Sequence, residues 1–258
     1  MLKVTGLTRT YRESGGVVHA LGPVDFRVER GSFLCILGPT GCGKTTLLRL
    51  LAGLEKPDSG GISLPAGAGG ASPVIGYVFQ QGALFPWMSV RSNVEFPLRA
   101  AGMDKSRRRK EAEKILDMMG LSGFEDSYPH QLSGGMRQRT ALARSLVVNP
   151  DILLLDEPFS SLDTRTSQEL QGSLRTLWKE SSTTVVFVTH NIEEAVFLAR
   201  KVIVLGHRPG RIVRFENIDL PEPRSRLSEE FTGYLVSLRR TFEELVSGEP
   251  EPVPVKPR

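Results

Sequence analysis

The chain has 258 residues, which is enough for one large, well-packed domain. Its apolar fraction of 40% and charged fraction of 24% are those of an ordinary soluble globular protein. The net charge of +4 suits an anionic ligand or an anionic membrane surface, but it is too small to indicate nucleic-acid binding. No apolar run approaches the length that spans a bilayer, and Met1–Val4 opens without the apolar core of a signal peptide, so we expect a protein that is soluble by itself.

Cysteine usage excludes a cysteine-based metal site. The chain has only two cysteines, Cys35 and Cys42, and no second pair. We therefore expect a reducing, cytosolic setting.

The N-terminal residues are predicted to form short strands. These are Leu2–Leu7, Val17–Leu21 and Val24–Val28, with turns at Gly15-Gly16 and Gly22-Pro23. Tyr11 is placed in the first connection, where spacing alone indicates an ordinary half-buried loop residue.

A phosphate-binding pattern, G-x-x-x-x-G-K-T, follows the strand-like run Ser32–Leu37 and precedes the helix-forming stretch Thr46–Ala52. Its residues are Gly38, Pro39, Thr40, Gly41, Cys42, Gly43, Lys44 and Thr45. Glycines let backbone N–H groups curl around a polyphosphate, and the helix N-terminus adds its partial positive charge. We therefore expect a nucleoside triphosphate here, with Lys44 on the β- and γ-phosphates and the Thr45 hydroxyl on Mg²⁺.

The middle of the chain changes to helical character. A turn at 55–61 and a Gly/Ala-rich loop at Pro65–Pro73 lead to the strand Gly76–Phe79, which ends at Gln80. Residues 90–146 are predicted to be helical, with one helix over Asp104–Met119. Its arginine cluster, Arg107 to Arg109, lies beside Glu111 and Glu113 and is interpreted as a solvated face.

Strands and helices then alternate, which predicts an α/β fold with a parallel sheet. The predicted elements are a helix over Met136–Val147 opened by Ser133-Gly134-Gly135, a buried strand in Asp151–Pro158, a helix over Thr166–Lys179, a strand over Thr184–Thr189, a helix over Glu193–Ala199 and a strand over Val202–Leu205. A last helix, N-capped by Ser228, is expected to pack its apolar face on the core, and residues 249–258 are expected to be a disordered tail.

Three polar residues follow the ends of predicted strands, where open α/β sheets bind ligands. Asp156 is expected to orient the Mg²⁺, and Glu157 to polarise the attacking water as general base. His190 could hold the γ-phosphate and the water. Simple capping of the following turn is the alternative for both acids, and the phosphate loop weakens it, most of all for Asp156.

The string Leu132–Arg139, L-S-G-G-M-R-Q-R, resembles the signature motif of the ATP-binding cassette (ABC) ATPases. The other motifs of that family follow in its order. Gln80 is similar to the Q-loop glutamine, Ser160–Asp163 resembles the D-loop, and His190 resembles the switch histidine. The resemblance runs from Leu2 to about Val213. It implies a P-loop NTPase of ABC type.

The architecture implied is a mostly parallel sheet core, an N-terminal antiparallel β subdomain and an inserted α-helical subdomain. The expected bounds are 1–248 for the whole ATPase domain, 1–89 and 147–220 for the core, 90–146 for the inserted helices and 221–248 for the C-terminal helix.

The resemblance also implies a set of site residues around ATP and Mg²⁺. Tyr11 becomes the aromatic that stacks on adenine, which reverses the interpretation from spacing alone. Beyond the phosphate loop the nucleotide would contact Thr46, Gln80, Ser133, Gly134, Gly135, Gln138 and Asp163. Thr45, Gln80 and Asp156 would ligate the metal, while Lys44, Glu157 and His190 would carry catalysis. Two departures, Asn191 for the usual aspartate and Thr45 for the common serine, are chemically mild.

By the same resemblance, two copies form a head-to-tail dimer around two ATP molecules. Ser133–Gly135 at a helix N-terminus is a second anion site, and one ATP cannot occupy two separate anion sites of one chain. Dimer closure would then depend on ATP, and opening on hydrolysis.

Transport is favoured over the DNA-maintenance ATPases of the superfamily, because Lys44 and Ser133 are only 89 residues apart (133 − 44) with no sustained heptads between them. The lack of a membrane span implies a permease on a separate chain, as in importers. Gln80–Trp87, Thr189–Leu198 and Arg208–Ile212 resemble the nitrate/sulfonate/taurine importer group.

The implied subunit sits peripherally on the cytoplasmic face of the membrane. It docks the permease near Gln80–Trp87, is served indirectly by an external substrate-binding protein, and binds no nucleic acid. Burial in the chain's own core is about as plausible a role for Leu84 and Phe85. A non-transport ATPase acting on nucleic acid, and an importer for a thiamine-precursor pyrimidine, remain as alternatives.

Overall fold

A computed structural model describes residues 1–13, 16–67 and 70–247, and the chain divides into two compact units. The first unit contains residues 1–65 together with the chain from residue 184 onwards, and the second contains residues 66–183. The predicted tail, residues 249–258, lies outside the described residues. None of the helices described combines the length and the apolar character that a membrane crossing requires.

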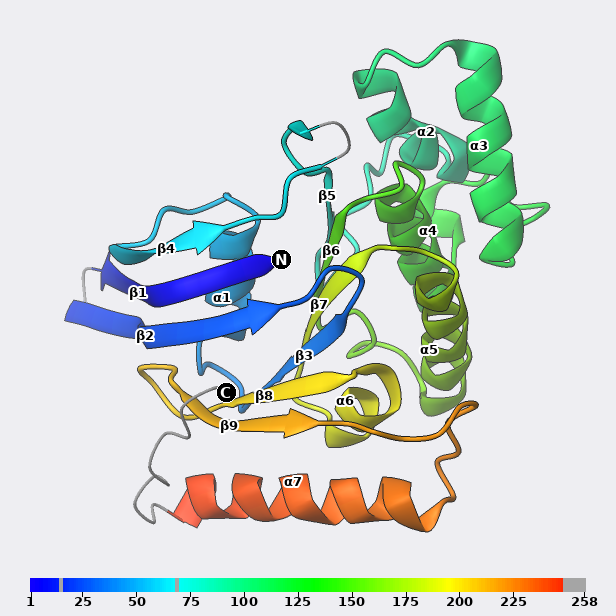
Figure 1. Ribbon diagram of the computed structural model, residues 1–258. Helices are drawn as coiled ribbons and strands as arrows, with labels where there is room; N and C mark the ends of the chain where they lie inside the picture. Colours follow the sequence, from blue (N-terminus) through cyan, green and yellow to red (C-terminus); the bar gives the residue numbers. More distant parts are fainter. Residues whose placement is uncertain (14–15, 68–69, 248–258) are drawn as a thin grey trace. The chain divides into compact units, whose positions relative to one another are not determined.

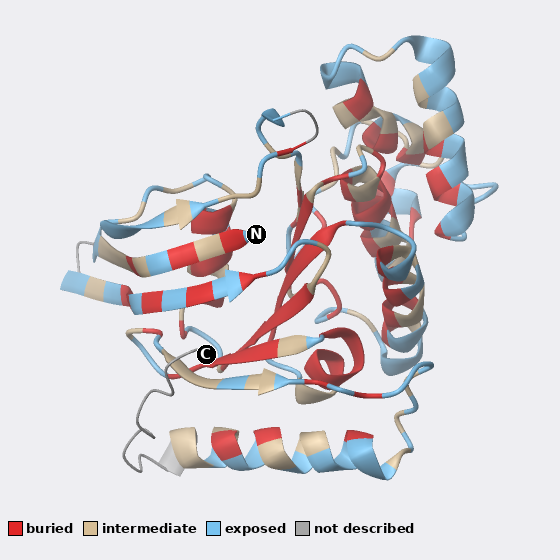
Figure 2. Cartoon of the chain, viewed as in Figure 1, coloured by how far each residue is buried: buried red, intermediate tan, exposed pale blue. Residues whose placement is uncertain are grey.

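The first unit opens with an antiparallel sheet in the order β2-β1-β4 (Figure 1). Its strands are β1 (Leu2–Glu13), β2 (Gly16–Val28) and β4 (Ser59–Ser63). Along the end of β2 buried and exposed residues alternate, so Val24, Phe26 and Val28 face the core (Figure 2). This alternation is the period of a half-buried strand.

Three predictions for this sheet were wrong. Tyr11 lies within β1 and not in a connection, and Gly22-Pro23 does not interrupt β2. β2 is an edge strand of this sheet, where a proline that cannot donate to a neighbouring strand is tolerated. Ser59 to Gly61 belong to β4 instead of a turn. Gly60 suits that strand because a Cβ there would lie 2.3 Å from the Gly6 carbonyl oxygen.

A second group of strands in this unit follows the order β7-β3-β8-β9. The strands are β3 (Phe33–Leu37), β7 (Thr184–Thr189), β8 (Lys201–Leu205) and β9 (Ile212–Asn217). β3 pairs in parallel with both β7 and β8, while β9 is antiparallel to β8. The three parallel strands were predicted from their apolar runs, and β9 was not, because its residues are half-buried or exposed.

Three helices complete the first unit: α1 (Lys44–Leu51), α6 (Ile192–Leu198) and α7 (Glu229–Ser247). The Ser228 hydroxyl accepts a hydrogen bond from the Phe231 N–H at 3.2 Å, which confirms the predicted cap. Phe231 and Leu238 are buried, so core packing of this helix is also confirmed. Arg214 of β9 donates to the Thr241 hydroxyl at 2.6 Å and holds α7 alongside β9 (Figure 1).

The second unit pairs two parallel strands and carries four long helices. The elements are β5 (Ile75–Val78), β6 (Ile152–Asp156), α2 (Val90–Ala100), α3 (Lys105–Met118), α4 (Gly134–Leu146) and α5 (Thr164–Lys179). α4 packs against α2, α3, α5 and β5 and is therefore the centre of this unit. The helices predicted over 104–119 and 166–179 are confirmed within two residues at each end.

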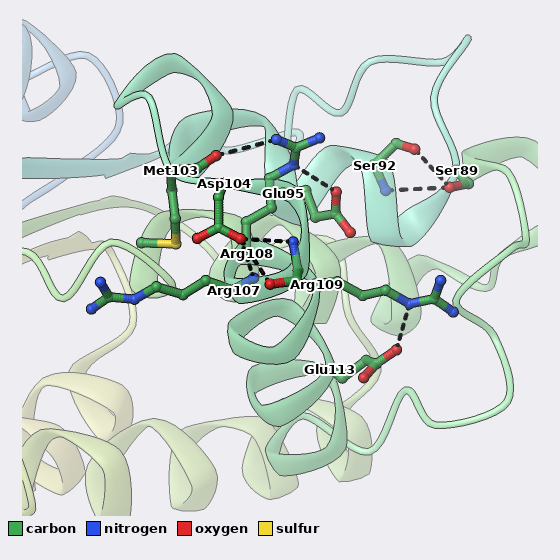
Figure 3. A network of polar contacts seen from close by, with 10 residues as sticks. Ser89, Ser92, Glu95, Met103, Asp104, Arg107, Arg108, Arg109 and Glu113 are labelled. Carbon is green, nitrogen blue, oxygen red and sulfur yellow. Dashed lines mark hydrogen bonds and ion pairs between the residues drawn. The ribbon is translucent and has the colours of Figure 1, made fainter.

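Two arginines of the α3 cluster, Arg108 and Arg109, form local ion pairs (Figure 3). Asp104 caps the helix through the N–H groups of Ser106 and Arg107, which lowers the pKa of its carboxyl group. Arg108 pairs with Glu95 at 3.1 Å, and Arg109 with Glu113 at 3.0 Å. The interpretation of a solvated face holds for Arg107 and Arg109, while Arg108 is half-buried between α2 and α3.

Candidate functional site

The loop at residues 38–45 joins the buried strand β3 to the first turn of α1. Gly41 and Gly43 have φ angles of 81° and 104°, a left-handed conformation that glycine adopts without a Cβ clash. A Cβ on Gly43 would lie 2.6 Å from the Ala20 carbonyl oxygen. The Lys44 ammonium is buried and donates to the carbonyls of Gly38 and Pro39 at 2.8 and 3.0 Å. The loop is thus a tight backbone turn closed over a lysine at a helix N-terminus, which is a geometry that binds anions.

Tyr11 lies close to this loop. Its hydroxyl donates to the Glu55 carboxylate at 2.6 Å and to the Thr46 hydroxyl at 3.4 Å. The Arg9 guanidinium stands 4.8 Å from the centre of its ring. The tyrosine is therefore fixed beside α1 with one face covered by a cation.

His190 follows β7 at the same sheet edge. Leu37 of β3 and Thr189 of β7 are register partners, so Gly38 and His190 leave neighbouring parallel strands together. Asn191 caps α6 by accepting from the N–H groups of Glu193 and Glu194. An aspartate would accept the same bonds, so the departure at Asn191 keeps the cap. The first unit thus brings together Tyr11, the loop and His190.

Asp156 and Glu157 lie at the end of β6 in the second unit. Asp156 is buried, and the Tyr77 hydroxyl donates to its carboxylate at 3.3 Å. Glu157 is half-buried and has a φ angle of 43°, which is rare for a residue other than glycine. Such local strain is concentrated at functional sites. Gln80 is exposed, two residues after Val78, which is the register partner of Leu155.

The turn Ser133-Gly134-Gly135 begins α4. The Ser133 hydroxyl accepts from the Met136 N–H at 3.2 Å, and Ser133 and Gly134 are exposed. A Cβ on Gly135 would lie 2.6 Å from Cγ2 of Thr166, so this glycine permits close packing against the first turn of α5. Asp163 caps α5 through the Thr166 N–H at 3.0 Å, and this bond lowers the pKa of its carboxyl group.

The predicted residues of the second unit therefore form two groups. Asp156, Glu157 and Gln80 follow the paired strands, while the signature turn and Asp163 meet at the starts of α4 and α5. Gln138 belongs to neither group. It is buried on α4, and its amide oxygen would lie 3.5 Å from a Cβ on Gly82.

The segment from Gln80 to Ser89 is held by two residues that sequence reasoning missed. Arg144 of α4 donates to the carbonyls of Gly82 and Ala83 at 3.0 and 2.9 Å, and burial lowers the pKa of its guanidinium. Trp87 projects from this segment with 70% of its surface exposed. Leu84 and Phe85 are half-buried, so their partial packing in the chain's own unit is observed.

Asn93 of α2 is the second residue that holds the segment from Gln80 to Ser89. It is fully buried, its amide nitrogen donates to the carbonyls of Phe85, Met88 and Ser89 at 3.0 to 3.1 Å, and its oxygen accepts from the Phe85 N–H at 2.8 Å. No motif marked it, because only the folded turn brings these backbone groups around one amide.

Replacing Asn93 with alanine is expected to destabilise the protein by about 2 to 4 kcal/mol, because several buried backbone groups lose their partner. Urea unfolding followed by circular dichroism measures the change. Ser92→Ala, at an exposed position of the same helix, is the matched control and should change stability by less than about 0.5 kcal/mol. Equal midpoints for the two variants would contradict this role of Asn93.

Comparison with known proteins agrees with this geometry. Residues 21–160 match the family model described as ABC transporter. The chain is 47% identical over 234 residues to an uncharacterised ABC transporter ATP-binding protein of Methanocaldococcus jannaschii, covering 90% of this chain and 88% of that protein. It is 45% identical to the nitrate import ATP-binding protein NrtD of Synechocystis, covering 85% and 83% of the two chains. It is 47% identical to the taurine import ATP-binding protein TauB of Yersinia pestis, covering 83% and 82%.

Among solved structures, an ATP-binding cassette whose dimer was determined in a post-hydrolysis state with ADP and Pi matches with a TM-score of 0.75. It is 34% identical to this chain, and the match covers 84% of this chain and 99% of that one. The chain therefore belongs to the ABC transporter family, as one of its ATPase cassettes.

Proposed function

We propose that this chain is the nucleotide-binding subunit of an importer, in which two copies close head-to-tail around two Mg-ATP and drive a separate membrane permease from the cytoplasmic face. The observation that carries the proposal is the pair of anion-binding turns on one chain. The phosphate loop begins α1 in the first unit, and the exposed turn Ser133-Gly134 begins α4 in the second. The dimeric cassette solved with ADP and Pi supports the same assembly.

In this proposal the nucleotide is held by the phosphate loop, Thr46 and Tyr11 of one copy and by Ser133, Gly134 and Gly135 of the other, with Asp163 and Gln138 in support. Glu157 is the general base, because it directly follows the carboxylate that closes β6 and is half-buried in a strained backbone conformation. Lys44 and His190 would hold the γ-phosphate.

The residues available fit Mg²⁺. Thr45, Gln80 and Asp156 supply a hydroxyl, an amide and a carboxylate oxygen, the hard ligands that this ion prefers. Within the described part of the chain, no group of three or more His, Cys, Asp or Glu side chains could hold a metal alone. That agrees with an ion which keeps waters and takes most of its other ligands from nucleotide phosphates. The ion would neutralise charge that develops on the transferred phosphoryl group.

The transported substrate is proposed to be a small anion of the nitrate, sulfonate or taurine kind. The relatives named for nitrate and for taurine import resemble this chain to nearly the same degree. Selection among such substrates would be made by the permease and an external binding protein.

Affinity purification from detergent-solubilised membranes tests the proposal. A tagged chain should recover a polytopic membrane protein in stoichiometric amount. The binding protein encoded with that permease can then be screened by thermal shift against nitrate, taurine, other sulfonates and a thiamine-precursor pyrimidine. Recovery of nucleic acid, or of no membrane partner, would overturn the importer assignment and leave the ATPase cassette.

Trp87→Ala is expected to weaken the permease complex by about tenfold or more, because an exposed tryptophan that buries its ring in a partner is a typical interface anchor. Its affinity for Mg-ATP should stay unchanged, since the side chain is largely exposed and is not among the proposed nucleotide contacts. Co-purified permease measures the first effect and fluorescent nucleotide titration the second. Phe124→Ala, which truncates another exposed aromatic residue, is the control. Undiminished permease recovery with Trp87→Ala would count against docking at this loop.

A further inference from the structure

The turn between β8 and β9, residues 206–211, is built against the phosphate loop. Its Gly210 N–H donates to the Ala20 carbonyl at 3.0 Å, and its carbonyl accepts from the Gly22 N–H at 3.0 Å. The turn is also closed on itself by a bond from the Gly206 N–H to the Arg211 carbonyl at 2.9 Å. The bonds to Ala20 and Gly22 fix the 206–211 turn on β2, the strand that precedes β3.

The contact with the phosphate loop itself is very close. A Cβ on Gly210 would lie 2.1 Å from the Cys42 carbonyl oxygen, so only glycine fits at this position. Gly38 is also closely approached, because a Cβ on it would lie 2.9 Å from the Leu205 carbonyl oxygen at the end of β8. The end of β8 and the 206–211 turn therefore both lie in close contact with the loop backbone.

Arg208 extends from the 206–211 turn to the loop backbone. Its Nε donates to the Gly41 carbonyl at 2.9 Å, and its Nη2 would be 3.1 Å from a Cβ on Gly41. The Cys42 N–H on the same peptide donates to the Pro39 carbonyl at 3.3 Å. The Gly41–Cys42 peptide is thus fixed at both of its polar ends, in a loop where glycine φ angles would otherwise leave it free to rotate.

Lys44 and Arg208 bind different backbone carbonyls of the loop. Lys44 binds those of Gly38 and Pro39, while Arg208 binds that of Gly41. Arg208 is exposed and uses its Nε for this bond, so its two NH₂ groups stay at the rim of the loop. A guanidinium in this place adds positive potential where an anion would sit. It also orders the loop before the ligand binds, which lowers the entropic cost of binding.

We propose that Arg208 is a positioning residue for the phosphate loop and a second cation of its anion site, raising affinity for the di- and triphosphate chain of the nucleotide. This inference rests on the proposed assignment of residues 38–45 to phosphate binding. Its ligand class is a nucleoside di- or triphosphate. Arg208 acts through the loop backbone and takes no part in proton transfer.

Arg208→Ala tests the proposal. Losing one charge-assisted, solvent-exposed hydrogen bond should raise the Kd for fluorescent ATP and ADP analogues by about five- to tenfold. KM for ATP should rise by a similar factor, while kcat at saturating Mg-ATP changes by less than about twofold, because the lost interaction is made in the ground state as well. The melting temperature without nucleotide should be unchanged, since Arg208 is exposed. Arg208→Lys, which keeps the charge, should recover part of the affinity.

Two further variants distinguish a wrong role for Arg208 from a wrong assignment of residues 38–45 to phosphate binding. His207→Ala, an exposed change in the same turn, should leave nucleotide affinity at the wild-type value. Lys44→Ala should abolish measurable binding if residues 38–45 hold phosphate. Wild-type affinity in Arg208→Ala beside lost binding in Lys44→Ala would overturn the role of Arg208 and keep the phosphate site. Retained binding in Lys44→Ala would overturn the site assignment itself. A loss in His207→Ala equal to that in Arg208→Ala would also overturn the proposal, because it would reflect general disturbance of the turn.

Discussion

Replacing Glu157 with glutamine is expected to lower ATP turnover by about 10²- to 10⁴-fold while leaving the affinity for Mg-ATP at its wild-type value. Glutamine keeps the size of the side chain but cannot accept the proton of the attacking water. Asp156 is less suited to that task, because it is buried at the end of β6 and its carboxylate already accepts from Tyr77. Phosphate release measures turnover, and fluorescent nucleotide titration measures affinity.

The same variant should accumulate an ATP-bound dimer, since closure needs ATP and opening needs its hydrolysis. Size-exclusion chromatography with ATP and Mg²⁺ should show a dimer for Glu157→Gln, whereas the wild type returns to monomer as ATP is consumed. Glu180→Gln, at an exposed position after α5, is the control and should behave as the wild type. Only monomer for Glu157→Gln, or turnover near the wild-type rate, would contradict the sandwich mechanism.

Sequence patterns located the buried parallel strands accurately, because an apolar run depends on neighbours in the chain. The turns predicted at Gly22-Pro23 and at residues 59–61 were wrong, because pairing with other strands decides whether a glycine interrupts a strand. β7 has the predicted bounds, Thr184–Thr189. A run of β-branched and aromatic residues between polar ends strongly favours a strand. The phosphate loop and the cap at Ser133 were predicted for the same reason, whereas the cap at Asp163 was not predicted. Both predicted patterns need only a glycine or a side-chain oxygen at a fixed distance along the chain.

The parts that could not be predicted depend on contacts between distant segments. Arg208 meets Gly41 across 167 positions of sequence, and no local pattern distinguishes it from other surface arginines. Asn93 looks like any polar residue on a helix until the turn at Phe85 folds over it. β9 was missed because an edge strand with half-buried residues lacks the apolar run that marks β3.

The largest stability effect is expected at Arg224, whose side chain is only 2% exposed. Its Nη1 donates to the carbonyls of Val196, Phe197 and Ala199 at 2.7 to 3.1 Å, and its Nη2 to that of Ile218 at 3.2 Å. The first three lie at the C-terminal end of α6, where backbone carbonyls have no partner within the helix. One buried guanidinium therefore caps the C-terminal end of α6 and joins this helix to the segment that leads to α7.

The neighbouring Arg226 holds the other end of the same helix. It pairs with Glu193 at 3.0 Å, and its guanidinium lies 3.5 Å from the centre of the Phe197 ring. α6 begins directly after His190 and Asn191, so both arginines contact the helix that follows His190. The segment carrying Arg224 and Arg226 therefore joins α6 to the part of the chain that precedes α7.

Arg224→Ala is expected to destabilise the protein by about 3 to 5 kcal/mol, because removing a buried charged partner leaves several carbonyls without a donor. That loss corresponds to a fall in melting temperature of roughly 10 °C for a chain of this size. Arg240→Ala is the matched control, since Arg240 is 82% exposed and forms only a surface ion pair with Glu244 on α7. Differential scanning calorimetry measures both variants. A melting temperature for Arg224→Ala within about 2 °C of the control would show that α6 ends independently of this residue. If the role is as described, α6 and α7 lose hydrogen-exchange protection together in Arg224→Ala, because one side chain joins them.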